Sequence, residues 1–319
     1  MHHPKYSVVI PVYNRPEEVN ELLASLVRQT YQNFEVILVE DGSSVTSQSV
    51  FETYAEKLDI KYYFKPNTGP GPSRNFGFEK ARGDYFVVFD SDCVIPSTYF
   101  QAVEQFMANS KLDAWGGPDR GHENFTPLQQ AMGYTMSSFL TTGGIRGGKK
   151  KLTWFQPRSF NMGISRAVYE TLGGFKLDRY AEDIEFAIRM RKAGFKAELI
   201  SEAFVYHKRR TSLKEFFRQV RNFGKGRAIV GRLHPSEIKI AHWLPFLFTL
   251  GLFAAMVMAF VLPPIGLIML AVYGLYTFVL AVDAFGKLRS WPAALFAVPS
   301  AYVQLIGYGV GFLKERLKG

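Results

Sequence analysis

Two aspartates separated by one residue end an apolar run in the first third of the chain. The run spans residues 86–89 and continues into Asp90, Ser91 and Asp92. Such β-branched and aromatic residues are typical of a buried strand, and alternate residues of an extended chain point the same way. Both carboxylates could then reach one point and hold a hard divalent cation against phosphate oxygens. A strand that simply ends in an Asp-Ser turn is the alternative interpretation.

Polar residues also follow the other strands that the sequence predicts. Tyr13 and Asn14 follow the first strand, Glu40 and Asp41 the second, and a polar stretch at 67–75 the third. In open α/β sheets, ligands bind beyond the carboxyl ends of the strands. Four successive polar clusters therefore predict a binding site at that edge.

Strands and helices alternate along this half of the chain. The predicted strands span residues 6–12, 34–39, 60–64 and 84–90, and the predicted helices span residues 17–30, 45–58 and 72–81. This alternation predicts an α/β fold, with a mostly parallel sheet covered by helices on both faces.

Six short motifs resemble those of the family 2 glycosyltransferases, which have the GT-A fold. Their order and spacing over residues 6–210 match the family. The motifs are Val9-Ile10-Pro11-Val12-Tyr13-Asn14, Val39-Glu40-Asp41-Gly42-Ser43, Gly71-Pro72-Ser73-Arg74-Asn75, Asp90-Ser91-Asp92, Asn161-Met162-Gly163-Ile164-Ser165-Arg166 and Ala181-Glu182-Asp183-Ile184-Glu185-Phe186.

The resemblance implies a donor site for a nucleotide-sugar, for which a UDP-sugar is favoured. Asp41 would accept a hydrogen bond from the base, or it could form an Asx-type turn before Gly42. Arg74 would reach the donor, or it could be an ordinary arginine on a helix surface. The implied donor-binding residues are Pro11, Val12, Tyr13, Asn14, Asp41, Arg74, Asp90 and Ser91.

The same resemblance implies a bound Mg²⁺ or Mn²⁺. Asp92 would bind the cation, with Asp90 turned towards the ribose or the metal. The cation would offset the charge on the departing diphosphate. His207 would complete the metal shell, or it could be a solvated histidine beside the basic residues 208–210.

Glu182 and Asp183 precede a helical apolar pattern that ends at Gly194. Carboxylates are stabilised at a helix N-terminus, which would explain both acids without any catalytic role. The resemblance instead places the pair in the catalytic centre and implies that Asp183 deprotonates the acceptor hydroxyl. A single base facing the diphosphate implies direct displacement with inversion at the anomeric carbon.

Two basic segments are candidates for contact with the acceptor or with lipid. The first, residues 141–151, has four glycines and includes Arg146, Lys149 and Lys150; it is predicted to be a loop that could act as a lid, contact lipid phosphate or only be solvated. The second includes Arg221, where processive members of the family carry Gln-x-x-Arg-Trp. This chain lacks the tryptophan, which favours transfer of a single sugar.

The basic residues are concentrated in the C-terminal third of the chain. The net charge of +10 resolves into −1 for residues 1–206 and +11 for residues 207–319, which indicates a membrane surface rather than nucleic acid. Residues 240–282 carry no formal charge and are split by Pro263-Pro264 into two spans, at about 243–262 and 265–282. Residues 291–313 are predicted to form a third span, with a re-entrant segment as the alternative.

These observations predict a cytoplasmic catalytic domain at 1–206, a basic amphipathic interfacial helix within 207–239 and a multi-pass membrane domain at 240–319. The positive-inside rule, the lone Cys93 and the missing leader all favour a cytoplasmic catalytic domain at the cell membrane.

The predicted function is transfer of one sugar to a lipid-linked or envelope saccharide. A polyprenyl-phosphate glycosyltransferase is the alternative, and a non-catalytic nucleotide-binding scaffold is disfavoured because the acidic motifs are present.

Overall fold

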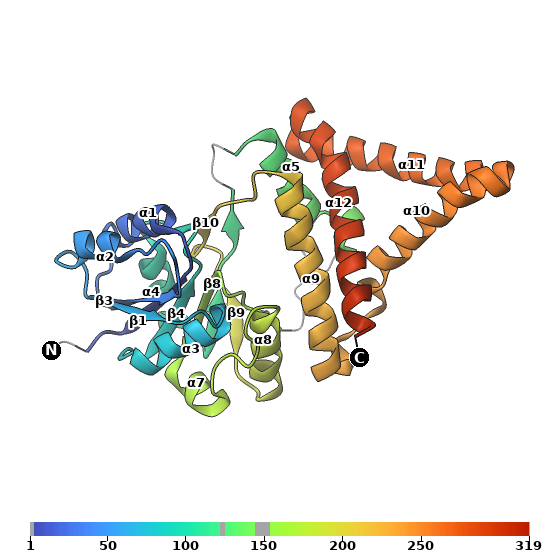
Figure 1. Ribbon diagram of the computed structural model, residues 1–319. Helices are drawn as coiled ribbons and strands as arrows, with labels where there is room; N and C mark the ends of the chain where they lie inside the picture. Colours follow the sequence, from blue (N-terminus) through green and yellow to red (C-terminus); the bar gives the residue numbers. More distant parts are fainter. Residues whose placement is uncertain (1–2, 122–124, 144–153, 319) are drawn as a thin grey trace. The chain divides into compact units, whose positions relative to one another are not determined.

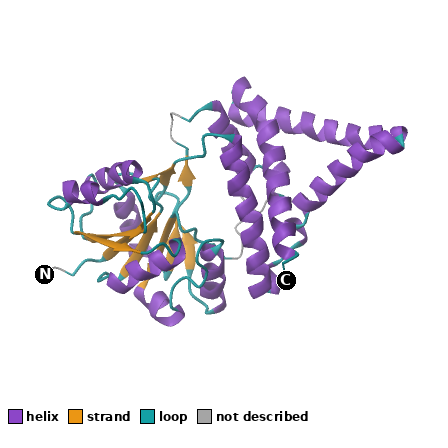
Figure 2. Ribbon diagram, viewed as in Figure 1, coloured by secondary structure: helices purple, strands orange, loops and turns teal. Residues whose placement is uncertain are grey.

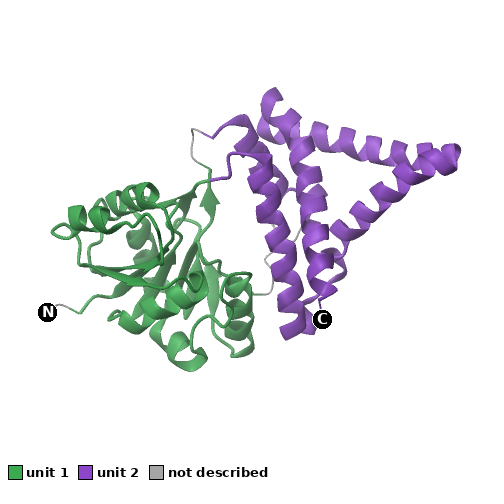
Figure 3. Cartoon of the chain, viewed as in Figure 1, with its two compact units in different colours: residues 1–122, 151–208 green, residues 123–150, 209–319 purple. Residues whose placement is uncertain are grey.

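The computed structural model describes residues 3–121, 125–143 and 154–318, which form two compact units. The first unit comprises residues 1–122 and 151–208, and the second comprises residues 123–150 and 209–319 (Figure 3). Our predicted boundary at 206/207 lies near the second crossing between the units. The prediction did not separate residues 125–143, which pack with the C-terminal helices, from the catalytic domain.

A seven-stranded sheet forms the centre of the first unit (Figures 1 and 2). The strand order is β3-β2-β1-β4-β8-β6-β9; β8 is antiparallel to both of its neighbours, and the other pairs are parallel. The strands are β1 (Tyr6–Val12), β2 (Phe34–Asp41), β3 (Ile60–Lys65), β4 (Tyr85–Phe89), β6 (Ala114–Gly116), β8 (Asn161–Ser165) and β9 (Ala197–Leu199). The predicted α/β fold with a mostly parallel sheet is confirmed.

Helices cover both faces of this sheet because its central strands are apolar on both sides. Val8 and Ile10 of β1 pack in one core with residues of α1 and α4, whereas Val9 packs in the other core with residues of α3, α7 and α8. These helices, with the short α2, are α1 (Pro16–Val27), α2 (Gln48–Tyr54), α3 (Pro70–Lys80), α4 (Tyr99–Asn109), α7 (Arg166–Leu172) and α8 (Glu182–Lys192). Burial on both faces explains why the strands read as continuous apolar runs.

A second, three-stranded sheet joins the chain after β4 to the end of the first unit. It has the order β5-β10-β7, made of β5 (Cys93–Val94), β10 (Val205–His207) and β7 (Asp119–Arg120). Cys93 is paired with His207 across the antiparallel β5–β10 pair. This pairing brings His207 next to the acidic motif although 114 positions separate the two partners in sequence.

Asp90 and Asp92 do not continue the extended strand, so our expectation that alternation aligns their carboxylates is wrong. β4 ends at Phe89, and residues 90–92 form a turn in which the Cys93 N–H donates to the carbonyl oxygen of Asp90 at 3.1 Å. The chain must turn here because β5 leaves the large sheet to pair with β10. The two carboxylates consequently take different directions.

The second unit is helical. Its elements are α5 (Pro127–Ser137), α6 (Phe139–Thr142), α9 (Leu213–Leu233), two short 3₁₀ turns (Pro235–Glu237 and Ile240–His242), α10 (Leu244–Val261), α11 (Pro263–Leu288) and α12 (Trp291–Arg316). Within the described part of the chain, α10, α11 and α12 are long and apolar enough to cross a membrane. The C-terminal apolar helices that we predicted are therefore confirmed.

Candidate active site

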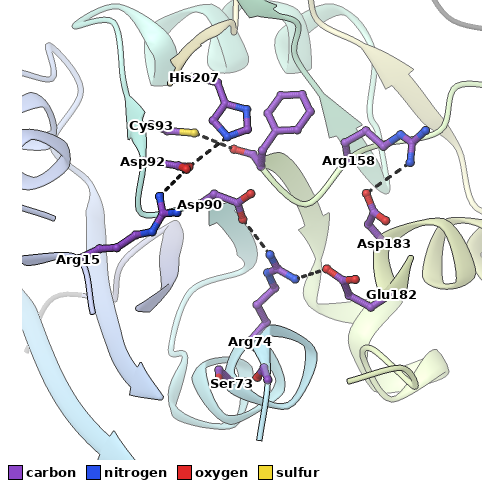
Figure 4. A network of polar contacts seen from close by, with 12 residues as sticks. Arg15, Ser73, Arg74, Asp90, Asp92, Cys93, Arg158, Glu182, Asp183 and His207 are labelled. Carbon is purple, nitrogen blue, oxygen red and sulfur yellow. Dashed lines mark hydrogen bonds and ion pairs between the residues drawn. The ribbon is translucent and has the colours of Figure 1, made fainter. Parts of the chain in front are cut away.

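The carboxyl ends of β2, β1 and β4 lie side by side because these parallel strands are neighbours in the sheet. The chain leaving β2 carries Asp41, and the chain leaving β4 carries Asp90 and Asp92. The N-terminus of α8 adds Glu182 and Asp183, and β10 adds His207. Figure 4 shows that Asp90 and Glu182 belong to one cluster and Asp92 and His207 to another, with Asp183 next to Glu182.

We call the first group, Arg74 with Asp90 and Glu182, the Arg74 cluster. Arg74 projects from α3 and donates from Nη2 to Asp90 Oδ1 at 2.8 Å and from Nη1 to Glu182 Oε1 at 2.7 Å (Figure 4). Its side chain is only 3% exposed, and its Nε has no hydrogen-bond partner among the described residues. Arg74 is therefore not a surface arginine, the alternative that we left open, but a buried bridge between the turn after β4 and α8.

Charge and burial compete within the Arg74 cluster. Burial disfavours the charged form of Arg74, but Asp90 and Glu182 raise its pKa above the ordinary value. Burial raises the pKa of Glu182 even though its ion pair with Arg74 acts in the opposite direction. Removing Arg74 would leave Glu182 buried without its counter-charge, and removing either acid would leave the buried Arg74 with one partner fewer.

The second group, Asp92 with Arg15, Cys93 and His207, we call the Asp92 cluster. His207 Nε2 lies 3.0 Å from Asp92 Oδ1, and Arg15 Nη1 lies 2.6 Å from Asp92 Oδ2 (Figure 4). Burial lowers the pKa of His207, but the hydrogen bond and charge of Asp92 raise it overall. Arg15 was not predicted from the sequence, although it directly follows Asn14 in the first motif.

Metal-ligating atoms of Asp92, Cys93 and His207 lie within 4.8 Å of one another. The Cys93 thiol donates to the carbonyl oxygen of Phe160 at 3.6 Å, and burial raises its pKa well above the ordinary value, so it stays a thiol. Asp92 and His207 remain as an oxygen and a nitrogen ligand. A carboxylate suits Mg²⁺ and Mn²⁺ and an imidazole favours a transition metal, so these two ligands could hold a divalent cation. Asp90 is not part of this group.

Asp41, the last residue of β2, holds the loop between β3 and α3 in place. Its carboxylate accepts the backbone N–H groups of Thr68 and Gly69, each at 2.9 Å, and pairs with Lys65. Burial opposes ionisation of Asp41, but these hydrogen bonds hold its pKa below the ordinary value. The carboxylate is therefore ionised and fixed in direction, which suits an acceptor for a base N–H. Lys65 was not among the predicted site residues.

The predicted base-flanking residues surround the end of β1. Val12 is buried, Pro11 is half-buried and Tyr13 is 53% exposed. Asn14 has a positive φ of 54°, and its side-chain oxygen accepts the N–H groups of Ser44 and Val45 at 2.9 and 3.0 Å. Asn14 thus ties the loop after β1 to the loop after β2. Ser91 is buried in the turn after β4.

Asp183 is the more accessible of the two acids that begin α8. Its side chain is 16% exposed, and Arg158 Nη1 lies 3.5 Å from its Oδ2, whereas Glu182 is held by Arg74 (Figure 4). The N–H of Ile184 also donates to Asp183 Oδ1 at 2.8 Å. These contacts fix the direction of the carboxylate and leave the group within reach of solvent. No sequence signal distinguished Arg158 as the partner.

Of the four residues predicted to contact the acceptor or lipid, only Arg221 belongs to the described part of the chain. Arg146, Lys149 and Lys150 lie outside the described residues. Arg221 is on α9 in the second unit. Their roles stay predictions.

The family model for glycosyl transferase family 2 matches residues 7–173, just over half of the chain. The chain therefore belongs to the family 2 glycosyltransferases. The matched stretch includes Asp41, Arg74, Asp90 and Asp92 and ends before α8, so it contains neither Asp183 nor His207.

Curated relatives match parts of the chain. An uncharacterized glycosyltransferase of Haemophilus influenzae is 38% identical over 114 residues, which are 35% of this chain and 46% of that protein. The probable glycosyltransferase YdaM of Bacillus subtilis is 28% identical over 244 residues, which are 71% of this chain and 56% of YdaM. The chain thus spans about half the length of these two relatives.

Solved structures share the fold. The mannosyltransferase PcManGT from Pyrobaculum calidifontis, in complex with GDP-Man and Mn²⁺, has a TM-score of 0.62 at 19% identity and covers 98% of this chain and 88% of its own. S. aureus TarS in complex with UDP-GlcNAc has a TM-score of 0.52 at 22% identity and covers 70% and 66%. The predicted GT-A fold is confirmed.

Proposed function

We propose that this chain transfers a single sugar from a nucleotide-sugar to a lipid-linked or saccharide acceptor, with inversion at the anomeric carbon. The supporting observation is the cluster of Asp92 and His207 beside Asp183 (Figure 4), together with Asp41 at the carboxyl end of the neighbouring strand β2. Asp41 is suited to binding the donor base, Asp92 and His207 to binding the cation, and Asp183 to deprotonating the acceptor hydroxyl.

The donor base binds beside Asp41 and the residues that follow β1. Asp41 is held ionised by Lys65 and two backbone N–H groups, so its free lone pairs keep a fixed direction. Tyr13 is exposed and offers a ring against which a base can stack. PcManGT and TarS were solved with a guanosine and a uridine donor respectively, and we propose a UDP-sugar as the first donor to test.

Asp92 and His207 would hold the divalent cation, Mg²⁺ or Mn²⁺. When bound, the cation supplies Lewis-acid stabilisation of charge on the departing diphosphate. Arg15 shares Asp92 at 2.6 Å and carries a positive charge to the same place. Asp90 stays with Arg74 and shapes the floor of the site.

Asp183 is the proposed general base. The acceptor hydroxyl gives its proton to the Asp183 carboxylate while its oxygen bonds to the anomeric carbon, and the nucleoside diphosphate departs with the electrons of the broken bond. Glu182, which we predicted beside it, is held by Arg74 at 2.7 Å and positions the start of α8. Displacement by one base on one face produces inversion.

The acceptor is proposed to be presented at the cytoplasmic face of a membrane. Apolar helices of the second unit provide the anchor, and the basic helix α9 precedes them in the chain. The missing tryptophan after Arg221 supports addition of one sugar rather than polymer growth.

The test is a transfer assay on the purified full-length chain. UDP- and GDP-sugars are first screened with Mn²⁺ by thermal shift, and the stabilising donor is then offered with a polyprenyl phosphate or with a lipid-linked saccharide. We expect stabilisation by one nucleotide class and a labelled lipid product of inverted configuration. Donor binding without transfer to any acceptor, and without donor hydrolysis, would favour a non-catalytic scaffold and contradict the proposal.

A further inference from the structure

The three long apolar helices of the second unit differ in their surroundings. In the most apolar 18-residue window of α10 and of α11, the mean hydropathy is 2.3, and only 6% and 11% of the window is buried. In α12 the mean hydropathy is 1.4 and 44% of the window is buried. Side chains of α10 and α11 such as Phe253, Phe260 and Ile268 are largely exposed. The first two helices therefore need an apolar solvent much more than α12 does.

α10 and α11 form a hairpin whose two open ends rest on α12. The chain reverses at Leu262, between the two helices. The ring of Trp243, just before α10, lies 5.0 Å from that of Phe312 near the end of α12, and Tyr302 in the middle of α12 bonds Thr277 in the second half of α11 at 2.8 Å. Figure 1 shows α10 and α11 converging on a tip and α12 running across their separated ends as the third side of a triangle. If the hairpin crosses a bilayer, α12 would therefore lie along the bilayer surface rather than across it.

α9 packs along the C-terminal half of α12. A Cβ atom on Gly224 would lie 2.1 Å from the carbonyl oxygen of Tyr308, and one on Gly311 would lie 2.0 Å from that of Arg221. Glycine is required at both positions for the two backbones to approach this closely. The pair is also joined by Arg232 and Glu315, whose charged atoms are 2.7 Å apart. α9 and α12 thus occupy the same depth relative to any membrane.

The charged side chains of α9 argue against placing α9 and α12 in the hydrocarbon. Exposed cations recur from one end of α9 to the other, at Lys214, Arg218, Arg221 and Arg232. An α12 that crossed the bilayer would carry these side chains into the lipid core, where charged groups are strongly disfavoured. At the bilayer surface the same cations meet lipid phosphates, and long stems reach into the interface.

The distribution of charge along the chain agrees with this placement. Residues 240–282 carry no formal charge, whereas Lys287 and Arg289 follow α11 and Lys314, Arg316 and Lys318 end the chain. If α12 crossed, these two basic groups would lie on opposite faces of the membrane. If it does not cross, every basic group of the second unit lies on one face, as the positive-inside rule favours.

We propose that only the α10–α11 hairpin enters the hydrocarbon, and that α12 lies along the membrane surface as a platform together with α9. The exposed side chains of the hairpin contact the lipid core, and the platform of α9 and α12 contacts the phosphate headgroups. Apolar residues of α12 that remain exposed, such as Leu295, Phe296 and Val310, embed at that interface. In this proposal α12, which we predicted as a third span, does not cross the membrane.

Cysteine labelling of the full chain in membrane vesicles tests the proposal. The native Cys93 is 1% exposed, so the unmodified protein gives the background with a membrane-impermeant maleimide. Single cysteines are placed at Arg289→Cys and Lys318→Cys, on either side of α12, and at Leu262→Cys at the tip of the hairpin. Phe260→Cys, 89% exposed, is a second tip variant in case the first does not insert.

We expect Arg289→Cys and Lys318→Cys to label in inside-out vesicles and to stay at background in right-side-out vesicles, with the tip variants showing the reverse. Labelling of Lys318→Cys on the face opposite to Arg289→Cys would show that α12 crosses and would overturn the proposal. Labelling of both tip variants on the same face as Arg289→Cys would overturn it as well. Neither outcome depends on enzymatic activity, so the test is separate from that of the proposed function.

Discussion

Asp90 and Asp92 are two residues apart, yet their carboxylates belong to two clusters that are built differently. In the Arg74 cluster, a fully buried cation holds Asp90 of the loop after β4 and Glu182 of α8 at hydrogen-bond distance. In the Asp92 cluster, an acid shares its two oxygens between Arg15 and His207, both of which remain partly exposed. The first cluster closes a network between elements, and the second presents ligand atoms. A shared sequence motif therefore contains one residue suited to positioning and one suited to binding.

The adjacent acids of α8 repeat this contrast, and the largest predicted effect tests it. Asp183→Asn keeps the shape of the side chain but removes its basicity, so we expect transfer to fall about 10²- to 10⁴-fold with donor affinity retained. Asp178→Asn, an exposed change in the loop before α8, is the matched control and should transfer normally. Transfer is measured by product formation and donor binding by calorimetry. Wild-type turnover of Asp183→Asn would remove it as the base.

Breaking the Arg74 cluster should affect the whole first unit. Arg74→Met leaves Asp90 and Glu182 without their cation, and we expect the free energy of unfolding to fall by about 3 to 5 kcal/mol. Arg74→Lys keeps the charge but not the fork that reaches both acids, so its loss should be smaller. Urea unfolding of the solubilised protein measures both.

Arg82→Met is the matched control for Arg74→Met. Arg82 also joins two acids, but its side chain is 29% exposed and that of Asp59 is 52% exposed. The buried Glu35 keeps hydrogen bonds from Ser7 and from the backbone N–H of Arg82, so the loss should be smaller. Equal destabilisation by the two substitutions would show that burial of the Arg74 cluster has no special weight.

The contrast between the clusters also shows what the sequence could reveal. Continuous apolar runs predicted the strands and the α/β fold, and the bounds predicted for elements of the first unit differ from the structure by up to four residues, as for α2 (predicted 45–58, found Gln48–Tyr54). The partners of the acids were not predicted, because Arg15 meets Asp92 and Arg158 meets Asp183 through tertiary contacts between distant segments. The turn at Asp90–Asp92 depends on the pairing of β5 with β10, which local alternation does not contain.

Metal affinity should respond with opposite signs to changes in the Asp92 cluster. Asp92→Asn removes a ligand charge and should weaken Mn²⁺ binding by about a hundredfold, the upper range for altered metal surroundings. Arg15→Gln removes a cation that shares the same carboxylate, so it should strengthen Mn²⁺ binding by up to about tenfold. Titration of the free Mn²⁺ signal by electron paramagnetic resonance measures both. Weaker binding in Arg15→Gln would mean that Arg15 organises the cluster rather than competing with the metal.

The smallest predicted effect concerns Asp41, which belongs to neither cluster and links β2 to the start of α3. Burial opposes its ionisation, but Lys65 and the N–H groups of Thr68 and Gly69 hold its folded-state pKa below the ordinary value of 3.8. The stability that this shift contributes is fully present above pH 3.8 and is lost as pH falls through the lower folded-state pKa. Asp41→Asn should therefore be less stable than the wild type at neutral pH and should lose less stability on acidification. Urea midpoints measured between pH 7 and pH 3 test this. If the urea midpoints of the wild type and of Asp41→Asn fall by the same amount over the whole pH range, Asp41 is not the group that makes the stability of this loop depend on pH.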